Sequence, residues 1–205
     1  MKILAIIPAR GGSKGVPRKN IKLLGKMPLI EYTINAAKAS IGLAEIVVST
    51  EDVEIAIAAE VCGCKPPFVR PAELSEDDAS SISVVQHAIA FYENQNVFFD
   101  AVCLLQPTTP FRAKGFIDEA IQKFRNSGAD SLVSVLPIPH EYNPHWAFEE
   151  GQSGFLQIAT GESQIIPRRQ ELPKAFHRDG SIYLTKTEIA KAGSFYGKFI
   201  TYIES

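Results

Sequence analysis

The residues best suited to chemistry lie near the N-terminus, in a loop that follows a short apolar run. Residues 3–8 read Ile-Leu-Ala-Ile-Ile-Pro, and residues 9–20 read Ala-Arg-Gly-Gly-Ser-Lys-Gly-Val-Pro-Arg-Lys-Asn. This loop contains three glycines, four cationic side chains and no acid. Backbone amides freed by glycine, with Arg and Lys at the end of a buried strand, are suited to holding a polyanion. We therefore expect a ligand that carries phosphates, gripped by Arg10 and Lys14.

Two common phosphate-binding signatures do not match this loop. No Gly-Lys-Ser/Thr follows at the Walker A spacing, and the third glycine of the dinucleotide fingerprint is missing. Glu51 and Asp52 follow the second expected strand, but they adjoin a helix start and are poorly placed to bind a ribose. A solvated surface loop with incidental charges is the alternative that stays open.

Apolar patterns that alternate between strand and helix predict the fold. Buried strands are expected at residues 2–8, 45–50, 101–105, 131–136, 181–185 and 198–203. Helices are expected at residues 30–41, 54–61, 81–92, 116–128 and 186–192. The first helix would bury Ile30, Ile34, Ala37 and Ile41 on one face. This alternation predicts an α/β protein with a mainly parallel, doubly wound sheet covered on both faces. Ligands of such sheets lie at the carboxyl ends of the strands, where the 9–20 loop, the 106–110 loop and the residues after Thr50 would meet.

The pattern changes between about residues 137 and 175, where prolines and glycines interrupt short apolar stretches. We expect a β-rich arm inserted into one domain that spans residues 1–205. Trp146, Phe148 and Phe155 need a surface to bury against, and an arm too small for its own core finds that surface on a neighbour. The sequence therefore predicts a homodimer that packs through this arm.

Composition limits the partners and the compartment. The formal net charge is −2, so nothing favours nucleic acid or an anionic membrane as a partner. No secretory pattern and no membrane-spanning apolar run is present. Cys62, Cys64 and Cys103 lack zinc-site spacing and are expected to be reduced thiols. We expect a cytoplasmic protein.

Several ordered motifs are similar to those of the acylneuraminate cytidylyltransferase (CMP-sialic acid synthetase) family. They occupy residues 7–20, 70–74, 77–81, 104–112, 169–173 and 180–183. The resemblance implies a three-layer α/β/α fold of the nucleotide-diphospho-sugar transferase type. It also implies a reaction in which CTP and an acidic nine-carbon 2-keto sugar give the CMP-sugar and pyrophosphate. Family members use magnesium and form dimers through such an arm.

The same resemblance assigns residues to the nucleotide. Catalytic roles are implied for Arg10, Lys14 and Gln106. Nucleotide-binding roles are implied for Ala9, Arg10, Gly11, Ser13, Lys14, Lys19, Asn20, Arg70, Ala79, Ser80 and Ser81. From the residues alone, Ser80 or Ser81 could equally cap a helix, and both roles can hold at once.

Residues implied to bind the sugar are Gln106, Arg169, His177, Asp179 and Tyr183. Other interpretations stay open: Gln106 as a polar residue in a proline-flanked turn, Arg169 as part of an exposed arginine pair, and Tyr183 as a core residue. The family commonly has Arg-x-Asn-Gly before the returning strand, whereas this chain has His177-Arg178-Asp179-Gly180. A weaker cation and a carboxylate then face the sugar, so its identity stays open.

Family members bind magnesium with two closely spaced aspartates after the last strand. No acid here matches that motif, so we expect those ligands beyond residue 205 and assign no metal ligand. Two alternatives remain: a cytidylyltransferase for an eight-carbon 3-deoxy sugar acid, and a catalytically silent nucleotide-binding relative.

Overall fold

The computed structural model describes residues 1–12, 15–152 and 154–205, which form two compact units. The first unit comprises residues 1–134 and 180–203 together with residue 205. The second comprises residues 135–179 together with residue 204. The first unit contains the central sheet and the helices, so it is the part that organises a site.

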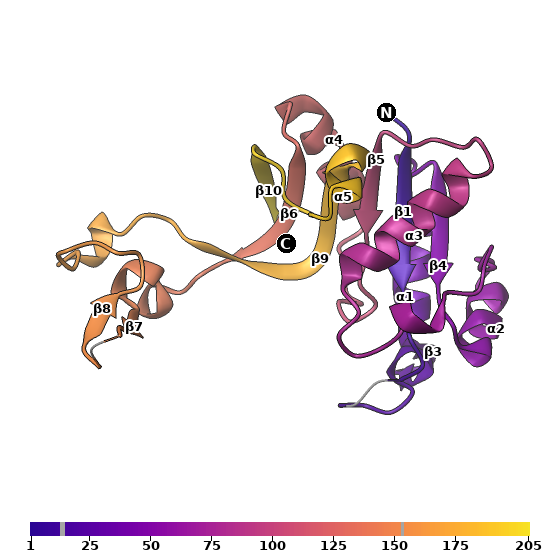
Figure 1. Cartoon of the computed structure of the whole chain (residues 1–205), viewed down its shortest axis with the longest axis horizontal. Coiled ribbons are helices and arrows are strands. Elements are labelled where there is room, and N and C mark those ends of the chain that lie inside the picture. Colours follow the sequence, from indigo (N-terminus) through magenta and orange to yellow (C-terminus); the bar gives the residue numbers. More distant parts are fainter. Residues whose placement is uncertain (13–14, 153) are drawn as a thin grey trace. The chain divides into compact units, whose positions relative to one another are not determined.

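The central sheet has six strands in the order β10-β6-β9-β5-β1-β4 (Figure 1). Their bounds are β1 Ile3–Pro8, β4 Glu45–Ser49, β5 Ala101–Leu104, β6 Ser131–Pro137, β9 Phe176–Lys186 and β10 Ile200–Glu204. β1 pairs in parallel with both β4 and β5, whereas β9 runs antiparallel to β5. The predicted α/β class with a mostly parallel sheet is confirmed.

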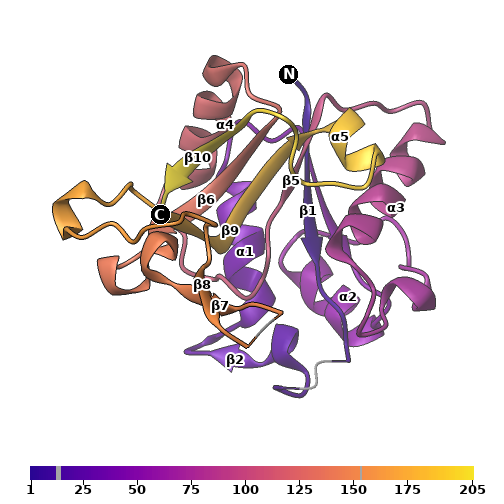
Figure 2. The same cartoon turned by 60° about the vertical axis from the view of Figure 1, so that its left-hand side comes forward.

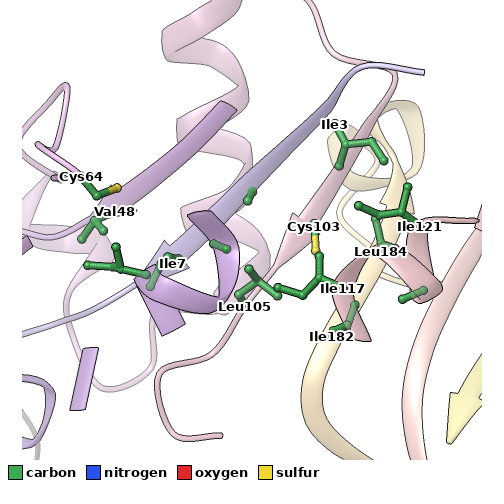
Figure 3. Close-up of a cluster of buried hydrophobic side chains, with 14 of the residues drawn as sticks. Ile3, Ile7, Val48, Cys64, Cys103, Leu105, Ile117, Ile121, Ile182 and Leu184 are labelled. Atoms are coloured by element: carbon green, nitrogen blue, oxygen red, sulfur yellow. The ribbon is translucent and has the colours of Figure 1, made fainter. Parts of the chain in front are cut away.

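Helices cover both faces of this sheet (Figure 2). α1 (Leu29–Lys38), α2 (Val53–Val61) and α4 (Phe116–Ser127) pack on one face, and α3 (Ser81–Glu93) and α5 (Thr187–Lys191) pack on the other. Side chains of β1 alternate between the two layers, because successive residues of a strand point to opposite faces. Ile3 and Ile7 join the first cluster (Figure 3), and Leu4 and Ile6 join the second.

Local signals explain where the helices begin and end. Asp52 caps α2 by accepting a hydrogen bond from the Ile55 amide (3.0 Å), and Ser80 caps α3 by accepting one from Ser83 (3.2 Å). Gly128 ends α4 with a φ of 66°, a conformation that favours glycine. The placement of Ile41 on the buried face of α1 is wrong: the helix ends at Lys38, and Ile41 is 93% exposed.

A small hairpin before α1 has no counterpart in the predicted elements. It consists of β2 (Leu23–Leu24) and β3 (Met27–Pro28), joined through Gly25 at a φ of 63°. A single turn of 3-10 helix, Lys19–Ile21, precedes it and ends the cationic loop. Two-residue strands leave no apolar alternation to detect, so these elements could not be read from periodicity.

The second unit has less strand than expected for a β-rich arm. Its hairpin pairs β7 (Phe148–Glu150) with β8 (Leu156–Ile158), and the 3-10 turns are His140–Tyr142, Pro144–Trp146 and Arg169–Glu171. Side-chain bonds to the backbone hold it together. Trp146 Nε1 donates to Ile166 O (2.7 Å), and the buried Asn143 amide donates to Pro173 O (2.9 Å). Several large apolar side chains of this unit are exposed, among them Tyr142, Phe148, Phe155 and Leu156.

Two further findings concern membrane spans and the cysteines. Among the described residues, no helix combines the length and apolar character needed to cross a bilayer. All three cysteines are free thiols, and burial raises the pKa of the Cys103 thiol to about 12.

Candidate functional site

A pocket of about 340 Å³ lies beyond the carboxyl ends of β1 and β5. Among the predicted site residues, those that line it are Arg10, Lys19, Asn20, Arg70, Ala79, Ser81 and Gln106. They come from four separate stretches of the chain, which the sheet brings to one edge. This is where an open α/β sheet is expected to bind its ligand.

Other predicted nucleotide-binding residues do not line this pocket. Ala9 is fully buried and extends the β1–β4 ladder, with its amide donating to Ser49 O at 2.9 Å. Ser80 acts as the cap of α3, the alternative that the sequence left open. Ser13 and Lys14 lie outside the described residues, so their predicted roles stay predictions.

Arg10 reaches across the pocket wall to the segment before α3. Its Nη1 donates to Glu76 O (2.8 Å), and its Nη2 forms an ion pair with Asp77 Oδ1 (2.9 Å). Glu76 and Asp77 also line the pocket. A polyanion that binds Arg10 must therefore compete with a carboxylate that already neutralises it.

The peptide unit between Arg10 and Gly11 is held at both of its polar ends. Its carbonyl accepts a hydrogen bond from Asn20 Nδ2 (2.9 Å), and its N–H donates to Glu51 Oε1 (2.7 Å). A Cβ on residue 11 would lie 2.3 Å from Asp52 Oδ2, so any larger residue would have to displace the Asp52 side chain. The Gly11 amide thus faces a carboxylate, not the pocket as the glycine-rich loop led us to expect.

Arg70 is buried, with 4% of its surface exposed, and it shares Glu51 with Gly11. Its Nη2 donates to Glu51 Oε2 (2.6 Å), and its Nε donates to Ser75 Oγ (3.0 Å). Partial burial alone would raise the pKa of Glu51, but the Gly11 amide and the Arg70 guanidinium outweigh it, so the pKa lies below its usual range. Glu51 is therefore a charged carboxylate at neutral pH.

Arg18, near the other end of the cationic loop, is bound by two acids that follow Glu51 in the chain, Asp52 and Glu54. Its Nη1 and Nη2 both donate to the Asp52 carboxylate, and Nη2 also donates to Glu54 Oε2 (2.5 Å). The Arg18 bond lowers the pKa of Asp52, although partial burial opposes it. The acidic turn at residues 51–54 therefore holds the loop on both sides of the undescribed residues.

Gln106 is positioned by an arginine that the resemblance did not single out. Arg112 donates to Gln106 O (2.9 Å), to Ser181 O (3.0 Å) and to Thr33 Oγ1 (3.0 Å), which joins the 106–110 loop to β9 and α1. Gly180 adopts a φ of 86°, and a Cβ there would lie 3.1 Å from Gln106 Oε1. The Gln106 amide therefore lies close against the β9 backbone.

Residues predicted to bind the sugar fall into both units. Arg169 and His177 are exposed residues of the second unit, which also contains the partly buried Asp179. Tyr183 lies in the first unit, is 7% exposed and packs against Phe195 with 5.8 Å between ring centres. It belongs to the core cluster under α3 and α5, which is the alternative position stated for it. The sugar-binding roles stay predictions.

The resemblance implies magnesium held by aspartates beyond residue 205, and that expectation stays a prediction. Within residues 1–12, 15–152 and 154–205, no group of three His, Cys, Asp or Glu side chains is arranged to hold a metal ion.

The side chains around the pocket are better suited to nucleotidyl transfer between two substrates than to covalent catalysis by the protein. Arg10, Lys19 and Arg70 place positive charge around one pocket, where it can stabilise charge on a polyphosphate. Gln106 can position a reacting group by hydrogen bonding, but its amide cannot accept a proton. Positioning and charge stabilisation are the contributions these side chains can make.

Known proteins resemble this chain over most of its length. A family model described as Cytidylyltransferase matches residues 4–196. The pseudaminic acid cytidylyltransferase of Campylobacter jejuni subsp. jejuni serotype O:2 is 40% identical over 184 residues, covering 89% of this chain and 78% of the relative. The CMP-N,N'-diacetyllegionaminic acid synthase of Legionella pneumophila subsp. pneumophila is 39% identical over 199 residues, covering 97% of this chain and 84% of the relative.

A solved structure supports the fold independently. The CMP:2-keto-3-deoxy-manno-octonic acid synthetase complexed with CTP aligns with a TM-score of 0.72, covering all of this chain and 90% of that one at 18% identity. At that identity, the likeness concerns the fold alone. The family match and the sequence relatives show more: this chain is a nucleotidyltransferase that belongs to the cytidylyltransferase family.

Proposed function

We propose that the protein transfers the cytidylyl group of CTP to an acidic, sialic-acid-like nine-carbon 2-keto sugar. The observation that carries the proposal is the pocket at the strand ends, where Arg10, Lys19 and Arg70 of the family motifs come together. The sequence relatives named for pseudaminic and legionaminic acids support the sugar class.

In the proposed reaction, the anomeric hydroxyl of the sugar attacks the α-phosphorus of CTP. A bond forms between that oxygen and the phosphorus, and the bond from phosphorus to the bridging oxygen of the β-phosphate breaks. Pyrophosphate leaves with the electron pair, and the hydroxyl proton passes to solvent. Arg10 would stabilise the charge that develops on the triphosphate, and Gln106 would orient the sugar.

Base and ribose would lie against the 70–81 segment. Arg70, Ala79 and Ser81 line the pocket there, and Asn20 of the N-terminal loop lines the same pocket. Polar groups that pair with one base reject others, because an unmatched buried donor or acceptor is costly. We therefore expect CTP to be preferred over UTP.

The test is pyrophosphate release from CTP and magnesium with a panel of sugar acids. Pseudaminic, N,N'-diacetyllegionaminic and N-acylneuraminic acids represent the nine-carbon class, and 2-keto-3-deoxy-manno-octonic acid represents the eight-carbon class. We expect the largest kcat/KM with a nine-carbon acid. Faster release with the eight-carbon acid would overturn the proposed sugar class. CTP binding without release for any acid would favour a silent nucleotide-binding relative.

We further propose that two copies associate through the second unit. Tyr142 and Phe155 are each 76% exposed and Leu156 is 70% exposed, because the second unit is too small to bury them in a core of its own. Light scattering at assay concentration is expected to give twice the mass of one chain. A monomer at that concentration would contradict the dimer without affecting the proposed reaction.

A further inference from the structure

The acidic residue behind the pocket joins two pocket-lining segments through one carboxylate. Glu51 Oε1 accepts the Gly11 amide (2.7 Å), and Glu51 Oε2 accepts Arg70 Nη2 (2.6 Å). Gly11 is 40 residues from Glu51, and Arg70 is 19 residues away, so no local turn requires this meeting. Among the described residues, the Glu51 carboxylate is the group that accepts hydrogen bonds from both Gly11 and Arg70.

The bond to Gly11 also orients Arg10. A peptide unit is planar, so fixing its carbonyl and its N–H fixes the whole plane. Asn20 holds the Arg10 carbonyl (2.9 Å), and Glu51 holds the N–H on the other side of the same unit. The backbone that follows the Arg10 Cα is thereby restrained, which limits where the Arg10 side chain can reach.

The contact between Glu51 and Arg70 is required by the charge of the buried guanidinium. The Arg70 side chain is 3% exposed, and a buried guanidinium needs a paired anion. The Glu51 side chain is 24% exposed, and the pocket-lining set among the described residues does not include it. A ligand in this pocket would meet Arg10 and Arg70, and Glu51 would act on it through them.

We infer that Glu51 is a positioning residue for the triphosphate of CTP, because it sets Arg10 and Arg70 in one fixed arrangement. This inference rests on the proposed function. It concerns nucleotide affinity and not the chemical step, since Glu51 does not line the pocket. A carboxylate beside a phosphate site would otherwise repel the ligand, but here two donors satisfy it.

Glu51→Gln tests the inference with the least change of shape. The amide oxygen can still accept the Gly11 N–H, but the Arg70 ion pair is lost and an amide donor faces the guanidinium. We expect the Kd of CTP by calorimetry, and KM for CTP, to rise about 10- to 100-fold, the effect of losing a charged hydrogen bond. We expect kcat at saturating CTP and KM for the sugar to change less than about threefold.

Asp118→Asn is the matched control. The Asp118 carboxylate also satisfies a loop, accepting bonds from Ser40 Oγ (2.5 Å) and the Gly42 amide (2.9 Å), but it is not among the residues that line the pocket. This variant is expected to lower Tm without changing KM for CTP. If Glu51→Gln lowers Tm and leaves the Kd of CTP within twofold of wild type, the positioning role is overturned.

Glu51→Asp covers the case in which Glu51→Gln fails to fold. It keeps the charge opposite Arg70 but is one methylene too short to hold both partners, so we expect a smaller rise in the Kd of CTP. A Kd equal to wild type would overturn the inference. Wild-type protein that binds no CTP would instead overturn the proposed function, so the two failures are distinguishable.

Discussion

Arg10→Ala is expected to lower kcat/KM for CTP by about 10²- to 10³-fold, the usual cost of removing one electrostatic stabiliser. Arg10 lines the pocket and can bind two phosphate oxygens at once, which no neutral side chain replaces. Arg10→Lys keeps the charge but loses the planar fork, so an intermediate loss is expected. Steady-state pyrophosphate release over a range of CTP concentrations measures both.

Two companion variants make this result specific. Asp77→Asn removes the carboxylate that pairs with Arg10 at 2.9 Å, so KM for CTP should fall about two- to fivefold, in keeping with the strength of a partly exposed pair. Arg125→Ala removes an arginine of α4 that donates to Met1 O, and the kinetics should not change. Wild-type kinetics for Arg10→Ala would exclude Arg10 from the reaction.

Arg112→Met is expected to lower the free energy of unfolding by about 2–4 kcal/mol. The substitution leaves Gln106 O, Ser181 O and the fully buried Thr33 hydroxyl without their cationic donor. Each belongs to a different element, so the loop, β9 and α1 all lose a common anchor. Urea unfolding followed by circular dichroism gives the difference from wild type.

The control for Arg112 is again an arginine of similar size. Arg125→Met removes one exposed bond and should change the free energy of unfolding by less than about 0.5 kcal/mol. Equal stability of the two variants would show that the three Arg112 bonds contribute nothing net to folding. Because Arg112 holds the Gln106 backbone, the surviving folded fraction is also expected to turn over more slowly.

The sequence predicts the sheet and its helices well because their signals are local. An unbroken apolar run marks β1, a serine hydroxyl marks the start of α3, and a glycine marks the end of α4. Each of these depends on residues within one or two turns. Ile41 shows the limit, since its apolar spacing continues past the point where the backbone leaves the helix.

The contacts that organise the site could not be predicted in this way. Arg112 meets Ser181 across 69 residues and Thr33 across 79. The meeting with Ser181 requires β9 to lie beside β5. Alternating strands and helices do not reveal an antiparallel strand placed there by a late return of the chain. Nothing near Glu51 in the sequence indicates that its carboxylate accepts a hydrogen bond from the Gly11 amide, 40 residues away.

Gly180 has an evolutionary consequence. Any side chain at this position would have to displace the Gln106 amide, which lies 3.1 Å from where the Cβ would be, and would also strain the backbone at a φ of 86°. Substitutions at residues 180 and 106 are therefore coupled. Homologues with a larger residue at position 180 should have a shorter residue at position 106.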